Sequence, residues 1–200
     1  MTGKFPVTKI SMLEELLKLD RELFLFLNNL GTPGWDGFWM FVTNKWSSIP
    51  LYVILLIIVY RNYGLRKTLF LLAAIALLIT VTDQLSNFFK MGVQRLRPCY
   101  DTDLEGMMRL VKSSCGGKFG YFSAHAANSF AIAFFFSFLF RSRYVLLPWI
   151  LILWAILVAS SRIYIGVHFP LDVMSGGLIG ILMAWLFSRL FIFAQHKFQL

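Results

Sequence analysis

Charged side chains are scarce in this sequence. Asp, Glu, Lys and Arg make up 14% of its 200 residues, whereas an ordinary soluble domain has about 25%. Hydrophobic residues make up 58% and aromatic residues 17%, a composition that excludes a water-soluble globular fold and indicates a membrane protein. Acidic residues are the scarcest, so the formal net charge is +9. The basic residues flank apolar runs instead of forming one patch, which favours membrane orientation over binding to nucleic acid.

The N-terminus has no long apolar run, so we expect no cleavable secretory signal. Residues 11–30 instead repeat apolar side chains at helical spacing behind a candidate cap, Ser11. Charged residues, Asp20 among them, occupy the rest of the helical wheel, a pattern that predicts an amphipathic helix in the membrane interface. The sequence GTPG at 31–34 ends this helix, and a tryptophan-rich segment typical of the headgroup level follows at 35–46.

Apolar runs fill most of the remaining sequence. They predict membrane-spanning helices near residues 48–61, 67–90, 125–140, 145–159 and 173–193, the first of them short for a span. We therefore expect an all-α integral membrane protein, a bundle of five or six transmembrane helices plus the N-terminal amphipathic helix. The chain 1–200 is expected to form a single domain, with interfacial helices in 1–45 and the transmembrane core in 46–196.

Short basic segments indicate the orientation. Residues 61–67 and 141–143, together with Arg189 and Lys197, would share one side, which the positive-inside rule makes cytoplasmic. The loop 91–122 and the stretch 161–172 would then share the outer side.

Polar clusters interrupt the apolar pattern on that outer side. In the first, KMGVQRLRP at 90–98, seven residues separate Lys90 from Arg97. We expect both cations on one helix face before Pro98 stops the helix. In the second, FSAHAAN at 122–128, Ser123 is placed as a helix cap. The free amides after such a cap form an anion site, and His125 falls within the first turn.

The third cluster is SRIYIGVHFPLD at 161–172. Pro170 suits the first position of a new helix, and Asp172 can reach back to His168, four residues earlier. With Lys90, Arg97 and Arg162, these groups are suited to bind a tetrahedral oxyanion. Arginine binds two phosphate oxygens through a pair of hydrogen bonds, and lysine supplies a compact positive charge. A histidine oriented by a carboxylate is a nucleophile or base, and a second histidine can supply a proton.

Together the clusters resemble the signature of the type-2 phosphatidic acid phosphatase superfamily, K-x6-RP, then PSGH, then SR-x5-H-x3-D. The first and third motifs match fully. The second retains Ser123 and His125 but has Phe122 and Ala124 where the family has proline and glycine. The resemblance extends from about residue 45 to 190.

The resemblance implies a lipid phosphatase that needs no metal and no cofactor. His168 would attack phosphorus, and Asp172 would orient the His168 imidazole. His125 would protonate the leaving group. The phosphoryl oxygens would be bound by residues from all three motifs, namely Lys90, Arg97, Ser123, Ala124 and Arg162.

The substrate stays open among membrane lipid phosphates. Phosphatidic acid, phosphatidylglycerol phosphate and undecaprenyl diphosphate are the leading candidates. The alternatives are a lipid phosphotransferase, a lipid A phosphatase and, less favoured, a non-catalytic anion-binding membrane protein. The expected location is a bacterial inner membrane, with the active site on the periplasmic face. Oligomeric state is left open.

Three further features carry expectations. Asp83 shares a helix face with Lys90, so it either pairs with Lys90 or Arg97 or lines a wet cavity. Cys99 and Cys115 lie in the outer loop and are predicted to form a disulfide worth about 3 kcal/mol. Three glycines near the C-terminus are expected to permit close helix packing, namely Gly176, Gly177 and Gly180.

Overall fold

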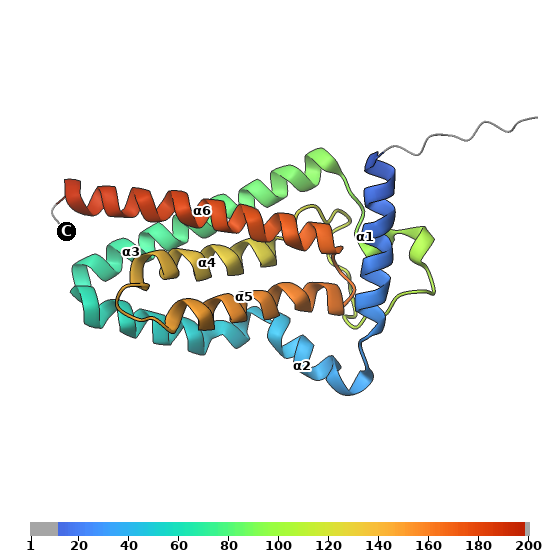
Figure 1. Ribbon diagram of the computed structural model, residues 1–200, viewed down its shortest axis with the longest axis horizontal. Helices are drawn as coiled ribbons and strands as arrows, with labels where there is room; N and C mark the ends of the chain where they lie inside the picture. The colour runs from blue at the N-terminus through green and yellow to red at the C-terminus, as the bar shows by residue number, and fades with distance from the viewer. Residues whose placement is uncertain (1–11, 199–200) are drawn as a thin grey trace, which may run out of the picture.

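Helices dominate the computed structural model, which describes residues 12–198 (Figure 1). The α-helices are α1 (Met12–Asn29), α2 (Pro33–Thr43), α3 (Ile49–Val93), α4 (Ala124–Phe140), α5 (Leu147–Tyr164) and α6 (Pro170–Lys197). Short 3-10 turns are η1 (Lys45–Ser48), η2 (Pro98–Tyr100) and η3 (Thr102–Leu104). The predicted all-α class is confirmed. Ser11, the expected cap of the first helix, lies outside the described residues.

A reversal within α3 joins two of the predicted spans. At Gly64 the backbone adopts φ 70° and ψ 179°, which glycine tolerates because it has no Cβ. Figure 1 shows the two arms of α3 meeting in a bend at one end of the bundle and both extending from there towards the other end. Of the described helices, the segment Lys45–Val93, α5 and α6 are long and apolar enough to cross a membrane, and α4 is a shorter apolar helix.

The bundle is centred on α4. Its phenylalanines Phe135, Phe136 and Phe140 are buried, whereas Leu178 and Leu182 of α6 are exposed on the outside of the bundle. Exposed leucines on the outside of the bundle suit a lipid surround, since lipid tails are as apolar as leucine.

Two glycines allow α6 to approach α4 closely. A Cβ at Gly176 would lie 2.5 Å from the Ser123 carbonyl oxygen, and one at Gly180 would overlap the Ala127 carbonyl. Gly177 is less constrained, with a Phe130 ring carbon at 3.4 Å. The packing role expected for these glycines is confirmed, and it presses the start of α4 against α6.

The helix α1 lies across one end of the bundle (Figure 1). Its apolar residues Leu16, Leu19, Leu23 and Phe26 are exposed, while the intervening positions Asp20, Phe24 and Asn28 are buried against the protein. The apolar stripe therefore faces away from the bundle, as suits a helix in the membrane interface.

One helix ends earlier than expected. α3 stops at Val93, and Gln94 turns the chain with a left-handed φ of 53°. The expectation that Lys90 and Arg97 share a helix face is therefore wrong. Arg97 lies in an extended segment whose backbone N–H donates to the Lys118 carbonyl at 3.1 Å, so the fold of the outer loop, and not helical periodicity, positions its side chain.

Candidate active site

The outer loop folds onto the connection between α5 and α6. Val111 N–H donates to the Ile165 carbonyl at 3.3 Å, and Ser123 N–H donates to the Asp172 carbonyl at 2.9 Å. Gly120 N–H donates to the Arg95 carbonyl at 2.8 Å. These backbone bonds bring the three polar clusters of the sequence to one end of the bundle.

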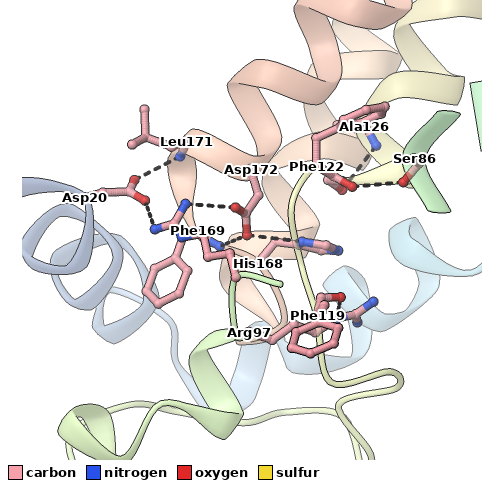
Figure 2. A network of polar contacts seen from close by, with 12 residues as sticks. Asp20, Ser86, Arg97, Phe119, Phe122, Ala126, His168, Phe169, Leu171 and Asp172 are labelled. Atoms are coloured by element: carbon pink, nitrogen blue, oxygen red, sulfur yellow. Dashed lines mark hydrogen bonds and ion pairs between the residues drawn. The ribbon is translucent and has the colours of Figure 1, made fainter. Parts of the chain in front are cut away.

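His168 and Asp172 form the centre of this region. α6 begins at Pro170, as predicted, and Asp172 lies in its first turn. The Asp172 carboxylate accepts a hydrogen bond from Phe169 N–H at 3.1 Å, and the same oxygen, Oδ2, lies 3.4 Å from His168 Nδ1. Figure 2 shows the two side chains facing each other. The predicted pairing is confirmed.

The burial of His168 determines its charge. Its side chain is 2% exposed, and burial lowers the pKa of the imidazole to about 4, although the Asp172 carboxylate acts in the opposite direction. At neutral pH the ring is therefore uncharged. With the Nδ1 proton directed at Asp172, the Nε2 atom keeps a free lone pair, which is the state a nucleophile requires.

Two arginines approach the pair from different elements. Arg97 donates from Nε to the Phe119 carbonyl at 3.1 Å and from Nη1 to the Cys115 carbonyl at 2.6 Å. Burial lowers the Arg97 pKa, and the charge of Asp172 opposes that shift. Arg162, on α5, is buried and donates from Nη1 to Thr43 Oγ1 at 2.5 Å.

The guanidinium of Arg162 retains unused hydrogen-bonding capacity. Its Nε is buried and has no hydrogen-bond partner within residues 12–198. Lys90 lies in the electrostatic field of Arg97, Arg162 and Asp172. The three cations predicted to bind phosphate are thus near enough to repel one another, and a bound anion would offset this repulsion.

Ser123 starts α4, as predicted. Its hydroxyl accepts from Ala126 N–H at 3.4 Å, and the residue is fully buried. His125 lies in the first turn, and the charges that act on its imidazole include Arg162 and His168. Ala124 and His125 both line an apolar cavity between α3 and α4. A direct contact of Ser123 or Ala124 with phosphate stays a prediction.

An apolar cavity of about 560 Å³ opens beside His125. One end is polar and includes Asp83 and Asn128. The remainder runs between the arms of α3 and α4 and is lined by aliphatic and aromatic side chains, among them Leu55, Val59, Leu71, Ile75, Ile132 and Phe136.

Asp83 belongs to this cavity wall. It accepts a hydrogen bond from Asn128 Nδ2 at 2.8 Å, and its charge acts on Lys90 at longer range. Its hydrogen-bond partner is therefore an amide, and not Lys90 or Arg97. Of the two expectations for Asp83, the structure agrees with a residue that lines the cavity.

A disulfide joins Cys99 to Cys115, with Cα atoms 6.3 Å apart. This is the pairing expected from the sequence. It closes the outer loop next to the Cys115 carbonyl that accepts from Arg97. The disulfide and Arg97, which is predicted to bind phosphate, are therefore held by the same turn.

Several residues near His168 were not anticipated from the sequence. Arg95 donates to Asp172 Oδ1 at 2.8 Å, and Asp20 of α1 bonds to Arg95. A Cβ at Gly120 would lie 3.0 Å from Asp172 Oδ2. Thr43 bonds to Arg162. Only Arg95 had a signal in the sequence, its place between Lys90 and Arg97 in the first motif.

Comparisons with known proteins identify the family of this chain. The family model described as PAP2 superfamily matches residues 67–195. A protein from Bacteroides thetaiotaomicron named lipid A 4'-phosphatase is 38% identical over 93% of this chain and 81% of its own length.

Two crystal structures share the fold. Aquifex aeolicus LpxE is 31% identical, with a TM-score of 0.62 over 86% of this chain and 95% of its own. A transmembrane PAP2 type phosphatidylglycerolphosphate phosphatase from Bacillus subtilis is 20% identical, with a TM-score of 0.68 over 88% of this chain and 86% of its own. From the family match, the similarity to the lipid A phosphatase and the shared fold, this chain belongs to the PAP2 superfamily and is a membrane lipid phosphatase.

Proposed function

We propose that this protein removes a phosphate monoester, the 4'-phosphate, from a lipid A-like saccharolipid. The observation that carries the proposal is the buried His168–Asp172 pair, whose histidine acts electrostatically on His125 in the wall of an apolar cavity, in a chain whose relative at 38% identity is named lipid A 4'-phosphatase. The relatives favour the saccharolipid over the glycerolipid and prenyl substrates that lead from sequence alone.

The proposed reaction passes through a phosphohistidine. Nε2 of His168 attacks phosphorus while the bond from phosphorus to the sugar oxygen breaks, and His125 gives its proton to that oxygen. The Asp172 carboxylate stabilises the positive charge that develops on the imidazole. Water then attacks phosphorus and loses a proton to His125. Phosphate leaves, and His168 returns to its neutral form.

Catalysis of phosphoryl transfer depends mainly on positioning the reacting groups and on electrostatic stabilisation of the transition state. Arg97, Arg162 and Lys90 surround the position of the transferring group, and the buried Nε of Arg162 is suited to donate to a phosphoryl oxygen. In surroundings of low dielectric such charge-assisted hydrogen bonds are stronger than in water.

The cavity supports a lipid substrate. Its aliphatic lining between α3 and α4 can receive part of an acyl chain while the phosphate lies at the polar end, where His125 lines the cavity. Burial of apolar surface contributes roughly 25 cal/mol per Å². Burial of the acyl chain can therefore supply binding energy that holds the phosphate in place.

We also propose that the site faces the periplasm of a bacterial inner membrane. The basic segments 61–67 and 141–143 lie at the end of the bundle away from His168, and they would be retained in the cytoplasm. The disulfide between Cys99 and Cys115 at the site end agrees with an oxidising compartment.

The test is phosphate release by purified protein from lipid A, with phosphatidylglycerol phosphate and undecaprenyl diphosphate as competing substrates. We expect lipid A to be preferred, with mass spectrometry placing the loss at the 4' position. His168→Asn should abolish release, whereas His196→Asn, an exposed histidine at the far end of α6, should leave it unchanged. Faster hydrolysis of either competitor would contradict the proposed substrate, and an active His168→Asn variant would contradict the mechanism.

A further inference from the structure

Arg95 lies between two carboxylates that come from opposite parts of the chain. Its Nη1 donates to Asp172 Oδ1 at 2.8 Å, and its Nη2 donates to Asp20 Oδ2 at 2.5 Å. The side chains of Asp20 and Asp172 are 2% and 0% exposed. Figure 2 shows Asp20, from α1, on one side of this bridge and Asp172, from α6, on the other.

The bridge constrains the carboxylate that faces His168. Oδ2 of Asp172 faces the imidazole, so the hydrogen bond from Arg95 to Oδ1 holds the plane of the carboxylate. The Arg95 guanidinium also contacts the Phe169 ring in a cation–π interaction, with its central carbon 4.3 Å from the ring centre. Rotation of Asp172 away from His168 would break the contact with Arg95.

Asp20 is in turn fixed by the start of α6. Its Oδ1 accepts from Leu171 N–H at 2.9 Å, one of the backbone donors that a helix start leaves without a partner in the helix. Burial raises the Asp20 pKa, and the bonds to Arg95 and Leu171 oppose that shift. Asp20 therefore caps the helix that carries Asp172 and also pairs with the arginine that orients it.

Other contacts dock α1 without Asp20. The Phe24 and Phe169 rings meet edge to face, with centroids 5.3 Å apart. Asn28 donates from Nδ2 to the Tyr164 carbonyl at 2.9 Å and accepts from Arg109 N–H at 2.7 Å. A change confined to the charge of Asp20 should therefore leave α1 in place, which makes its effect on Asp172 measurable.

We propose that Asp20 and Arg95 are positioning residues for Asp172, so that α1, on the membrane surface, holds the catalytic carboxylate against His168. This inference rests on the proposed phosphohistidine chemistry but not on the identity of the lipid. An interfacial helix thus completes an active site whose reacting residues all come from the later part of the chain.

The first test compares steady-state kinetics of lipid A hydrolysis. Asp20→Asn should lower kcat about tenfold with KM within about twofold, because orientation is lost in the transition state while substrate binding is retained. Asp20→Glu should recover part of kcat. Arg95→Gln should lower kcat about a hundredfold, and adding Asp20→Asn to it should cause no further loss, since both residues act through one chain of contacts.

The matched control is Asp36→Asn. Asp36 of α2 pairs with Arg109 at 2.9 Å and accepts from the Tyr164 hydroxyl, so it also ties an N-terminal helix to the outer loop, but it contacts neither His168 nor Asp172. Its kcat should stay within about twofold of wild type. Equal losses in Asp36→Asn and Asp20→Asn would show a merely structural role and overturn the proposal.

The second test does not depend on turnover. The sequence has three histidines, so the ¹⁵N resonances of His168 can be assigned by single substitutions. Asp20→Asn and Arg95→Gln should shift the His168 Nδ1 resonance, and Asp36→Asn should not. An unchanged resonance in folded Asp20→Asn protein would overturn the inference. If wild-type protein released no phosphate, the proposed function would fail, and this measurement would still decide the positioning role.

Discussion

At the scale of single residues, Asp172 is where the separate parts of the site meet. One carboxylate oxygen accepts from Arg95, and the other accepts from Phe169 N–H and faces His168. The backbone of Gly120 closes over this group. The carboxylate is therefore surrounded on every side that the structure describes, and small displacements there should affect the reaction more than the stability of the fold.

Gly120→Ala tests this arrangement. The new Cβ would lie 3.0 Å from Asp172 Oδ2 and 3.5 Å from His168 Nδ1, so the pair must shift to accommodate it. We expect kcat/KM to fall about 10- to 100-fold, since displacements of about 1 Å can have such effects. The control is Gly117→Ala in the same loop, where a Cβ would have no atom within 4 Å and activity should be retained. Wild-type activity in Gly120→Ala would show that the pair tolerates displacement.

At the scale of elements, the contact between α4 and α6 brings His125 and His168, the two histidines proposed to be catalytic, to one end of the bundle. α4 carries His125 in its first turn, and α6 carries Asp172 in its own. Gly176 and Gly180 let the two helices approach until the α4 backbone meets the α6 backbone. The separation of His125 from His168 therefore depends on the absence of side chains at these glycines.

Gly180→Ala should destabilise the protein. The added methyl would overlap the Ala127 carbonyl, and overpacking of this kind costs about 1–3 kcal/mol. We expect a lower Tm in detergent, measured by thermal unfolding, together with lower activity. Gly92→Ala is the matched control, since it is also a helical glycine but a Cβ there meets nothing within 4 Å. A Tm in Gly180→Ala equal to or above that of Gly92→Ala would contradict the packing argument.

At the scale of the whole molecule, the candidate site and the short basic loops 61–67 and 141–143 lie at opposite ends of an apolar bundle (Figure 1). The outer loop, α1 and the start of α6 gather at one end, and the end of α6 lies at the other (Figure 1). Exposed apolar side chains such as Leu153 of α5 and Leu182 of α6 cover the sides between them. This arrangement gives the membrane orientation a direct functional consequence, because it decides which leaflet the site can reach.

Reporter fusions at the C-terminus test the orientation. Because basic residues in short loops are retained in the cytoplasm, green fluorescent protein after Leu200 should fluoresce in bacteria, and alkaline phosphatase at the same point should be inactive. The reciprocal control places each reporter after Gly117, in the outer loop, where the pattern should reverse. Active alkaline phosphatase at the C-terminus would place the active site in the cytoplasm and contradict the proposed location.

The sequence by itself determined the helical membrane class and the pairing of His168 with Asp172. Apolar runs report burial in lipid directly, and His168 and Asp172 lie four residues apart, so one helix start is enough to bring them together. Lys90, Arg97, Arg162 and His125 were predictable as members of ordered motifs. The face shared by Lys90 and Arg97 was not, because α3 ends at Val93 and turns at Gln94.

Only the tertiary structure decided what holds the Asp172 carboxylate in place. Arg95 is 77 residues from Asp172 and 75 from Asp20, and Asp20 is 151 residues from Leu171. On a helical wheel Asp20 is one more charge of an amphipathic helix. It contacts the site because the apolar stripe of α1 faces away from the bundle, and the intervening positions Asp20, Phe24 and Asn28 face the protein. Helical periodicity and local spacing carry no information about such long-range contacts, which depend on how α1 lies across the bundle.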